Sequence, residues 1–281
     1  MQKTLKKYFV IFTVPTLLAF SFAFVIPFIM GVYMSFCEFT TVDNAKFVGV
    51  SNYVKAFAGS SSFMSAFGFT VKFVIVAILV VNLGAFGLAM LLTKKIRGTN
   101  IFRTVFFMPN LIGGIVLGYI WSMIFDGFLS MYNTSILMET RYGFWGLIIL
   151  MCWQQIGYMM IIYIAGLQNV PTDLIEAAKI DGATGWQTLK NVTIPMVMPS
   201  ITVCTFLTLS NSFKLYDQNL ALTAGAPSHK TEMLALNIVD TFYGRTGFQG
   251  VGQAKAVVFF IIVAIVGAVQ LVFTRNKEVD Q

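Results

Sequence analysis

The stretch EAAKIDGATGWQTLKNVTIP, residues 176–195, is polar and contains two glycines, yet it lies between two long apolar runs. The chain around it has 281 residues, of which 57% are hydrophobic and only 11% are charged, and 28 of them are phenylalanine. That composition is outside the range of soluble globular domains. It indicates a protein whose solvent is mostly lipid, with this polar stretch as a connection between membrane spans.

Six apolar runs are long enough to cross a bilayer as helices. A hydrocarbon core of about 30 Å takes about 20 residues of helix, and only helices and closed barrels satisfy their backbone groups there. The runs do not alternate apolar and polar residues as barrel strands would. We therefore predict an all-α transmembrane fold, a single domain over residues 1–281, with spans at residues 9–36, 71–92, 105–125, 144–167, 196–215 and 257–273.

Cationic residues flank the spans and predict the orientation of the chain. Lys94, Lys95, Arg97 and Arg103 fill the second connection, and further cations precede the first span and follow the last. By the positive-inside rule these connections are cytoplasmic, so both termini and the connection at residues 169–195 are expected in the cytoplasm. The outer connections carry cations too, so the bias is moderate. Since the cations do not gather on one polar face, the net charge of +7 does not indicate a nucleic-acid partner.

The connection between the fourth and fifth spans is predicted to form two short helices joined by a turn. Asp173 and Glu176 have the spacing of a capping box that starts the first helix, and Thr184 and Gln187 repeat that spacing for the second. Gly182 lies between them, where glycine ends a helix in the left-handed conformation without steric cost. Small apolar faces are formed by Leu174, Ala177 and Ala178 and by Trp186, Leu189 and Val192. Such an element can cover the ends of the spans or dock a partner, and the residues alone do not separate these roles.

Sequence patterns for nucleotide binding, metal binding and catalysis are missing from the chain. It has no G-x-x-x-x-G-K-[ST] stretch and therefore no P-loop for nucleotide phosphates. The one histidine, His229, has no second His or Cys at metal-ligand spacing, and Cys37, Cys152 and Cys204 are expected to be free thiols. No nucleophile elbow and no acid–base pair within a span is present. From these absences we predict that the chain is not an enzyme and has no cofactor of its own.

The spacing of the polar stretch resembles a known motif. EAA at residues 176–178, Gly182 after three further residues, and VTIP at residues 192–195 after nine more are similar to the EAA loop of ABC-importer permeases. Val192 and Ile194 stand where that pattern usually has Ile and Leu. In that family the loop is a coupling helix that inserts into a cleft of a cytoplasmic ATP-binding subunit. The resemblance implies that ATP and Mg²⁺ bind to partner ATPases, and it implies an ATPase-coupling role for Glu176, Ala177, Ala178, Asp181 and Gly182.

Three further stretches extend the resemblance along most of the chain. FVGVSNY (47–53), FFMPNLIGGIVLGYIW (106–121) and FKLYDQNLALTAGAP (213–227) are similar in order and spacing to carbohydrate-uptake permeases of the maltose type, in particular the F-type subunit. Residues 66–73, AFGFTVKF, depart from a common Asn-Thr pair, and Ala226 replaces a usual Gly. The resemblance implies a six-helix ABC importer permease fold in a bacterial cytoplasmic membrane, working by alternating access. It also implies four partner subunits: a second homologous permease, two ATP-binding subunits and an extracytoplasmic solute-binding protein.

Polar side chains within the fourth and fifth spans are candidates for contacts with a sugar. A neutral sugar needs amide or hydroxyl partners beside aromatic rings. The resemblance places six such residues at or near pocket positions of the maltose-type subunit: Gln154, Gln155, Tyr158, Thr208, Asn211 and Ser212. The same side chains can instead join helices through hydrogen bonds, as polar groups in membrane bundles commonly do. Both roles stay open from the sequence.

The alternatives are other transporter classes and a membrane enzyme. An ion-driven secondary transporter would place Asp, Glu or His at mid-span, whereas these spans offer amides and hydroxyls there. Within ABC importers, an amino-acid or glycerol-phosphate permease stays open, and a phosphorylated substrate would predict a pocket cation, for which Lys214 is the sole candidate. A membrane-embedded protease or acyltransferase would need paired catalytic groups that the chain lacks.

Overall fold

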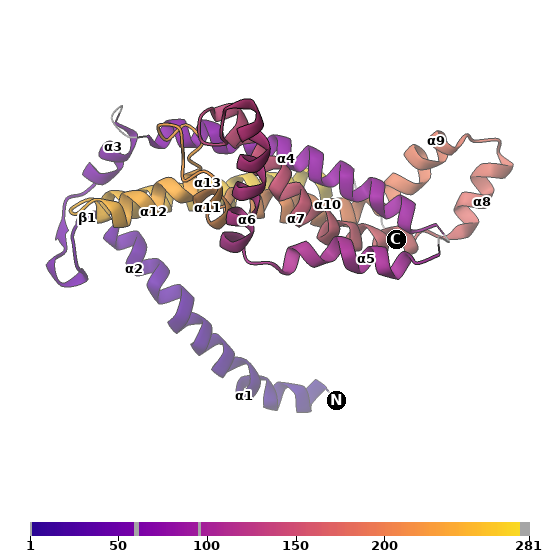
Figure 1. Cartoon of the computed structure of the whole chain (residues 1–281). Helices are drawn as coiled ribbons and strands as arrows, with labels where there is room; N and C mark the ends of the chain where they lie inside the picture. Colours follow the sequence, from indigo (N-terminus) through magenta and orange to yellow (C-terminus); the bar gives the residue numbers. More distant parts are fainter. Residues whose placement is uncertain (1, 59–61, 95–96, 276–281) are drawn as a thin grey trace. The chain divides into compact units, whose positions relative to one another are not determined.

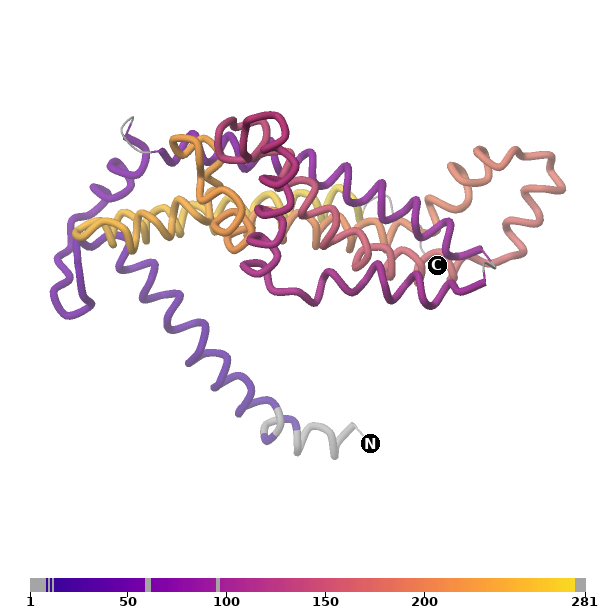
Figure 2. Tube along the Cα trace, in the orientation of Figure 1, coloured from indigo at the N-terminus to yellow at the C-terminus, as the bar shows by residue number. Residues whose placement is uncertain are grey.

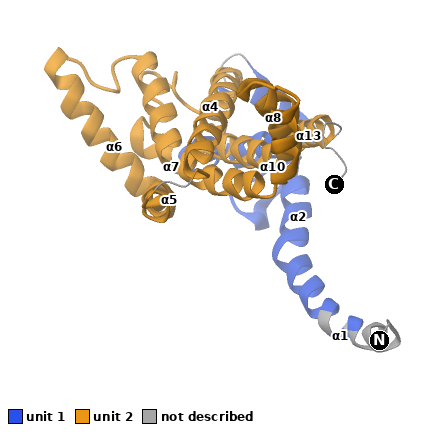
Figure 3. Ribbon diagram, turned by 90° about the vertical axis from the view of Figure 1, so that its right-hand side faces the viewer, with its two compact units in different colours: residues 1–63, 238–260 blue, residues 64–237, 261–281 orange. Residues whose placement is uncertain are grey.

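The computed structural model describes residues 2–58, 62–94 and 97–275, without the side chains of residues 2–8, 10 and 12 (Figure 1). Lys95, which contributes to the predicted orientation, lies outside the described residues. Apart from turns and irregular connections, the described residues form helices and one antiparallel pair of short strands, β1 (Cys37–Glu38) and β2 (Lys46–Phe47). Figure 2 traces the path of the chain, and Figure 3 colours the two compact units into which it divides, residues 1–63 with 238–260 and residues 64–237 with 261–281.

Six helical segments in the described residues are long and apolar enough to cross a membrane, as the composition predicts. Most of the predicted positions are correct to within about a helical turn or two at each end. The observed segments are Thr13–Met34, Phe63–Leu92, Gly114–Tyr132, Thr140–Gln168, Gly185–Phe213 and Gln249–Arg275.

The third span differs from the prediction, because the run at residues 105–125 is not one helix. Helix α5 (Thr99–Phe107) ends before a 3-10 turn, η3 (Met108–Leu111), and α6 (Gly114–Leu129) begins only after Gly113, whose backbone is extended. Pro109 has no N–H to continue the ladder of α5, and two adjacent glycines disfavour a helix at residues 113–114. The break turns the chain within the apolar run, so the span starts at Gly114.

The fifth span also begins earlier than predicted. Helix α9 (Gly185–Thr188), the π-helical turn η5 (Leu189–Thr193) and α10 (Ile194–Phe213) follow one another without interruption. Pro195, directly before the predicted boundary at residue 196, lies within a continuous helical segment in the structure. The second helix of the polar connection is therefore the first part of span five.

Unit 1 contains α1 (Gln2–Phe20), η1 (Ser21–Val25), α2 (Ile26–Met34), η2 (Val42–Asn44), α3 (Ser51–Phe57) and parts of α12 (Leu234–Gly244) and α13 (Gln249–Arg275). Asn52 on α3 organises its centre, since its side-chain amide donates to the carbonyls of Ser35 at 3.0 Å and Cys37 at 2.8 Å. Helix α13 begins eight residues before the predicted span, and so includes Lys255. The Lys255 ammonium is buried, donates to the Thr241 hydroxyl at 2.8 Å and lies 5.6 Å from the centre of the Phe63 ring.

Unit 2 contains the remaining parts of α12 and α13 together with α4 (Phe63–Leu92), α5, η3, α6, η4 (Ser130–Tyr132), α7 (Thr140–Gln168), α8 (Thr172–Ile180), α9, η5, α10 and α11 (Asp217–Leu222). Helix α4 buries residues spaced four apart, the spacing that keeps side chains on one face: Phe73, Ala77, Val81, Ala85 and Ala89. The small size of the three alanines allows close helix packing in a membrane. The ring of Phe86 meets that of Tyr163 on α7 at 5.4 Å, so α4 and α7 form the centre of the unit.

Candidate functional site

The turn after α8 has the geometry that the glycine predicts. Gly182 has φ +77°, a conformation that costs other L-residues energy. Its N–H donates to the carbonyl of Lys179 at 3.1 Å, and the N–H of Ala183 donates to that of Ala178 at 2.9 Å. These two bonds form a Schellman motif, which satisfies carbonyls that the end of α8 leaves without helical partners. The turn is therefore fixed by the local sequence.

The start of α9 is also as predicted. The Gln187 amide oxygen accepts from the Thr184 backbone N–H at 2.7 Å, and the Gln187 backbone N–H donates to the Thr184 hydroxyl at 3.3 Å. Both halves of the capping box are present.

The start of α8 differs from the prediction. The helix begins at Thr172, with Pro171 at the N-cap position and no side-chain cap, so Asp173 lies inside the first turn and forms no capping box with Glu176. The fixed φ of proline, −60° at Pro171, suits a helix start and moves it upstream of Asp173. The Asp173 carboxylate still lies near the positive end of the helix dipole.

The side chains of the connection are largely uncovered by the rest of this chain. Glu176, Ala177, Asp181 and Gly182 are exposed and Ala178 is half-buried, and α8 has no buried residue. Figures 1 and 2 show α8 and α9 standing out from one end of unit 2. The structure thus places the five predicted coupling residues on one protruding element.

Two large apolar side chains are exposed on the same element. Ile180 is 87% exposed and Trp186 is 71% exposed. An isolated isoleucine is normal on a surface, but two large apolar residues beside a patch of alanines are typical of an interaction site. The sequence gives a signal for Ile180, an aliphatic residue next to the turn in an otherwise polar stretch, which the interpretation above did not use.

Polar side chains of spans four and five form hydrogen bonds with other residues of this chain. On α7 the Gln154 amide oxygen accepts from the Gln218 side chain at 2.9 Å, and its amide nitrogen donates to the Ile112 carbonyl at 3.3 Å. The Gln155 oxygen accepts from the Asn211 side chain of α10 at 3.2 Å. Both glutamines are buried, at 6% and 8% exposure. The interhelical hydrogen bonds that the sequence left as an alternative are therefore present.

The other three predicted pocket residues form no hydrogen bond to the two glutamines in the part of the chain that the structure describes. The hydroxyls of Thr208 and Ser212 are fully buried and donate within α10, to the carbonyls of Cys204 at 2.8 Å and Thr208 at 2.6 Å. Tyr158 is half-buried, and its ring centre lies 6.3 Å from that of Phe107.

Asn82 on α4 joins three spans and was missed at the sequence level. Its side-chain oxygen accepts from the Tyr163 hydroxyl at 2.7 Å, and its nitrogen donates to the Thr208 hydroxyl at 3.3 Å. Since Asn82 is the one polar residue between residues 73 and 92, its isolation in an apolar run was a usable signal. Through it α4, α7 and α10 are linked by directional bonds as well as by packing.

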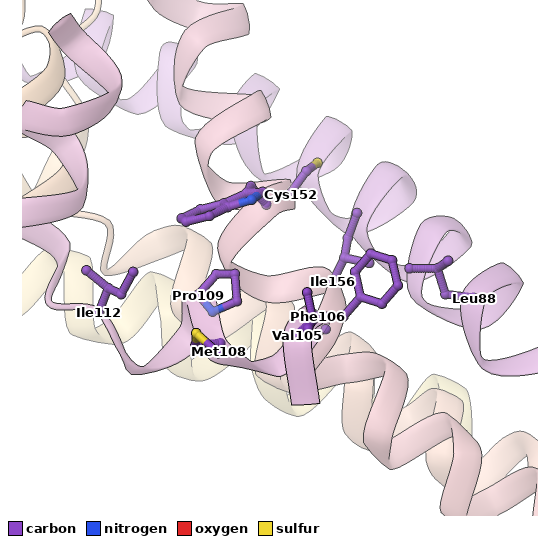
Figure 4. A pocket seen from close by; sticks show the side chains of 10 residues that line it. Leu88, Val105, Phe106, Met108, Pro109, Ile112, Cys152 and Ile156 are labelled. Atoms are coloured by element: carbon purple, nitrogen blue, oxygen red, sulfur yellow. The ribbon is translucent and has the colours of Figure 1, made fainter. Parts of the chain in front are cut away.

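A pocket of about 460 Å³ lies beside the break in the third span (Figure 4). Residues from α4, from α5 and η3, and from α7 line it: Leu88, Val105, Phe106, Met108, Pro109, Ile112, Cys152, Trp153, Ile156 and Gly157. These side chains present no amide, hydroxyl or charge, so the pocket lacks the partners that a sugar requires.

Comparison with known proteins identifies the chain. Residues 85–278 match the family model described as "Binding-protein-dependent transport system inner membrane component". The chain belongs to this family. It is 45% identical to the "Probable starch degradation products transport system permease protein AmyD" of Thermoanaerobacterium thermosulfurigenes, over 96% of this chain and 94% of the relative. It is 31% identical to the "Multiple sugar-binding transport system permease protein MsmF" of Streptococcus mutans serotype c, over 99% of each.

A solved structure shares the fold. The "bacterial ABC transporter involved in the import of the acidic polysaccharide alginate" contains a chain with a TM-score of 0.82 at 17% identity, covering 98% of both chains. The six-helix fold of an ABC-importer permease is confirmed, and with it a multi-pass membrane protein. Because members of this family are permease components of transport systems, the family assignment is consistent with a transport role and not with an enzymatic one.

Proposed function

We propose that this chain is one permease subunit of an ATP-driven carbohydrate importer. The named relatives support the substrate class, since they are permeases for starch degradation products and for multiple sugars. The family description supports a solute-binding protein as a partner. The complete importer contains a second homologous permease and two ATP-binding subunits, which hold the ATP and Mg²⁺ because this chain has no P-loop.

The protruding pair α8–α9 carries the coupling role in this proposal. Its turn is held by two backbone hydrogen bonds and its second helix by a capping box, while its outer side chains have no cover in this chain. Because the element is rigid and exposed, a partner subunit that binds to it can displace it as a unit. Glu176, Ala177, Ala178, Asp181 and Gly182 contact the ATPase, with the alanines allowing close approach. ATP then drives alternating access, provided that ATP and sugar favour different states of the complex.

The substrate contacts lie between α7 and α10 in this proposal. Gln154, Gln155, Tyr158, Thr208, Asn211 and Ser212 supply them, and their bonds in the empty chain exchange for bonds to sugar hydroxyls. The Gln155–Asn211 pair supports this, because a buried and a half-buried amide that satisfy each other can release each other to a ligand without leaving unpaired groups.

The orientation in the proposal follows from the cations of the sequence. Both termini and α8–α9 lie on the cytoplasmic side of a bacterial cytoplasmic membrane, where the ATPases bind. The connection after span five then faces the solute-binding protein.

The test uses the assembled complex in lipid vesicles with its ATPases and binding protein. We expect ATP hydrolysis to rise with the binding protein and a maltooligosaccharide, and not with an amino acid or glycerol phosphate. An Ala177→Leu variant should assemble but lose most sugar uptake, because the larger side chain blocks close approach at an exposed position. Lys190→Leu, which adds the same side chain at an exposed position of η5, is the control. Full uptake by Ala177→Leu would contradict the coupling role, and stimulation by an amino acid would contradict the substrate class.

A further inference from the structure

The apolar pocket of Figure 4 exists because the third span is broken. The break lets η3 and the end of α5 lie against α7, where Gly157 leaves room for the backbone of Phe106. The pocket walls are α4 and α7, both long enough to cross the membrane, together with residues 105–112 between them. Val105, Met108 and Trp153 each keep about half of their surface exposed in this chain. Hydrocarbon chains of the surrounding lipid are thus the solvent next to the pocket.

One end of the pocket is cationic. The Arg103 guanidinium donates to the carbonyl of Leu92, at the end of α4, at 3.3 Å. Arg103 precedes Phe106 on α5 by three residues and Leu92 follows Leu88 on α4 by four, so both ends of this hydrogen bond belong to residues about one helical turn, roughly 5.4 Å along the helix, beyond the pocket wall. Its buried Nε has no hydrogen-bond partner among the described residues.

Further charges at this end are positive. Lys94 and Arg97 are exposed beside it, in the connection that joins α4 to α5. Neither residues 88–112 nor residues 140–168 contain an aspartate or glutamate. An apolar pocket with cations at one end, on segments that carry no acidic residue, matches a molecule with an anionic head and a hydrocarbon tail.

We propose that this pocket binds an anionic phospholipid of the surrounding membrane. One acyl chain fills the space between α4, η3 and α7, and the headgroup phosphate accepts hydrogen bonds from Arg103 with Lys94 and Arg97 nearby. A zwitterionic phospholipid fills the same space less well, because its headgroup carries no net charge. Each cation near a membrane surface favours an anionic lipid by about fivefold. The site is separate from the α7–α10 amides and does not depend on the transported substrate.

Trp153 reports occupancy directly, because it lines the pocket and bromine atoms on a lipid chain quench indole fluorescence at contact. The assembled complex and its Trp153→Phe variant are placed in nanodiscs with dibromo-phosphatidylglycerol or dibromo-phosphatidylcholine, and the difference in fluorescence between the two complexes gives the signal of Trp153. We expect phosphatidylglycerol to quench Trp153 at a lower mole fraction. Arg103→Gln should reduce that preference about fivefold, whereas Arg103→Lys should keep most of it. Arg141→Gln is the control, since Arg141 lies on the same helix twelve residues from Trp153.

Two results would overturn the proposal. If neither brominated lipid quenches Trp153 in the assembled complex, protein covers the pocket, as a helix of the second permease would. If both lipids quench equally and Arg103→Gln changes nothing, the pocket takes any acyl chain and the cations recognise no headgroup. If Arg103→Gln fails to assemble, two comparisons still test the proposal. One compares Arg103→Lys with Arg141→Gln, and the other compares the two lipids on the unsubstituted complex. Stimulation of ATP hydrolysis by the binding protein, measured on the same samples, reports the importer function independently.

Discussion

Replacing Gly157 with alanine tests the packing on which the pocket and the broken span both depend. A Cβ atom at this position would overlap the carbonyl of Phe106 and lie 2.9 Å from the backbone nitrogen of Phe107, where ordinary contacts begin at 3.4 Å. The obstructing atoms belong to the backbone, so no side-chain rotation relieves the overlap. The end of α5 and η3 would have to move away from α7.

The magnitude follows from two opposing effects. Overpacking a close contact costs about 1–3 kcal/mol, and a backbone overlap belongs at the upper end of that range. Removing the flexibility of a mid-helix glycine offsets about 0.5–1 kcal/mol of this. We therefore expect Gly157→Ala to destabilise the protein by about 2 kcal/mol, a fall in Tm of about 4–8 °C for a chain of this size.

Gly87→Ala is the matched control. It lies inside α4, and among the described residues no atom outside the adjacent turns of that helix is within 4 Å of the position that its Cβ would take. Alanine there should raise stability by about 0.5–1 kcal/mol, because only the glycine flexibility changes. The measurement is the thermal loss of the monodisperse complex in detergent, followed by size-exclusion fluorescence. If Gly157→Ala melted at or above the parent while Gly87→Ala rose as expected, the approach of Phe106 to α7 would be wrong.

Three further predictions concern the connection and the span contacts. Gly182→Ala forces an alanine to φ +77°, at a cost of about 1–2 kcal/mol, so we expect fewer sugars transported per ATP hydrolysed, and an unchanged ratio would show that the turn has no coupling role. Thr184→Ala removes half of the capping box, which should weaken the start of α9 by about 1 kcal/mol and speed hydrogen exchange at its first amides; equal exchange rates would mean that the box contributes nothing. Tyr163→Phe and Asn82→Leu remove the two ends of one hydrogen bond, and a double-mutant cycle on thermal stability should give a coupling of about 0.6 kcal/mol, whereas additive effects would exclude the bond.

The sequence alone predicted the features that depend on local chemistry. Six spans follow from apolar runs of the right length, because the bilayer sets that length. The left-handed Gly182 and the box between Thr184 and Gln187 follow from residues at most three apart. In each case the partners are close in the chain, so no tertiary information is needed.

The features that were missed or misplaced depend on contacts between distant segments. Asn211 meets Gln155 from 56 residues away and Gln218 meets Gln154 from 64 residues away, so the four amides pair only after α7 and α10–α11 pack. Asn82 is a single polar residue whose two partners lie on other spans. A list of polar residues in spans therefore names candidates without saying which of them face one another.

Whether a proline breaks a helix could not be predicted from the sequence either. The turns before two of the prolines explain why span five is continuous. The π-helical turns η1 and η5 each end one residue before an Ile-Pro pair, with Ile26 N–H donating to the Ser21 carbonyl and Ile194 N–H to the Leu189 carbonyl. A proline clashes with the carbonyl four residues earlier in an α-helix, and a wider turn moves that carbonyl away. Pro15 and Pro199 lie in helices without such a turn, so proline permits the wider turn without requiring it.

The π-helical turn η5 determines how the connection α8–α9 is joined to span five. Because the π-turn accommodates Pro195 without a break, α9, η5 and α10 run as one helical segment from Gly185 to Phe213. At about 1.5 Å per residue, Asn211 lies about 39 Å along that segment from Gly185. A hinge at residue 195 would absorb a push on α8–α9, whereas a continuous helix carries it to the Asn211–Gln155 contact. This continuity is why a loosened turn at Gly182 is expected to lower transport per ATP: the turn, which two backbone hydrogen bonds hold in place, joins α8 to a helix that continues into span five.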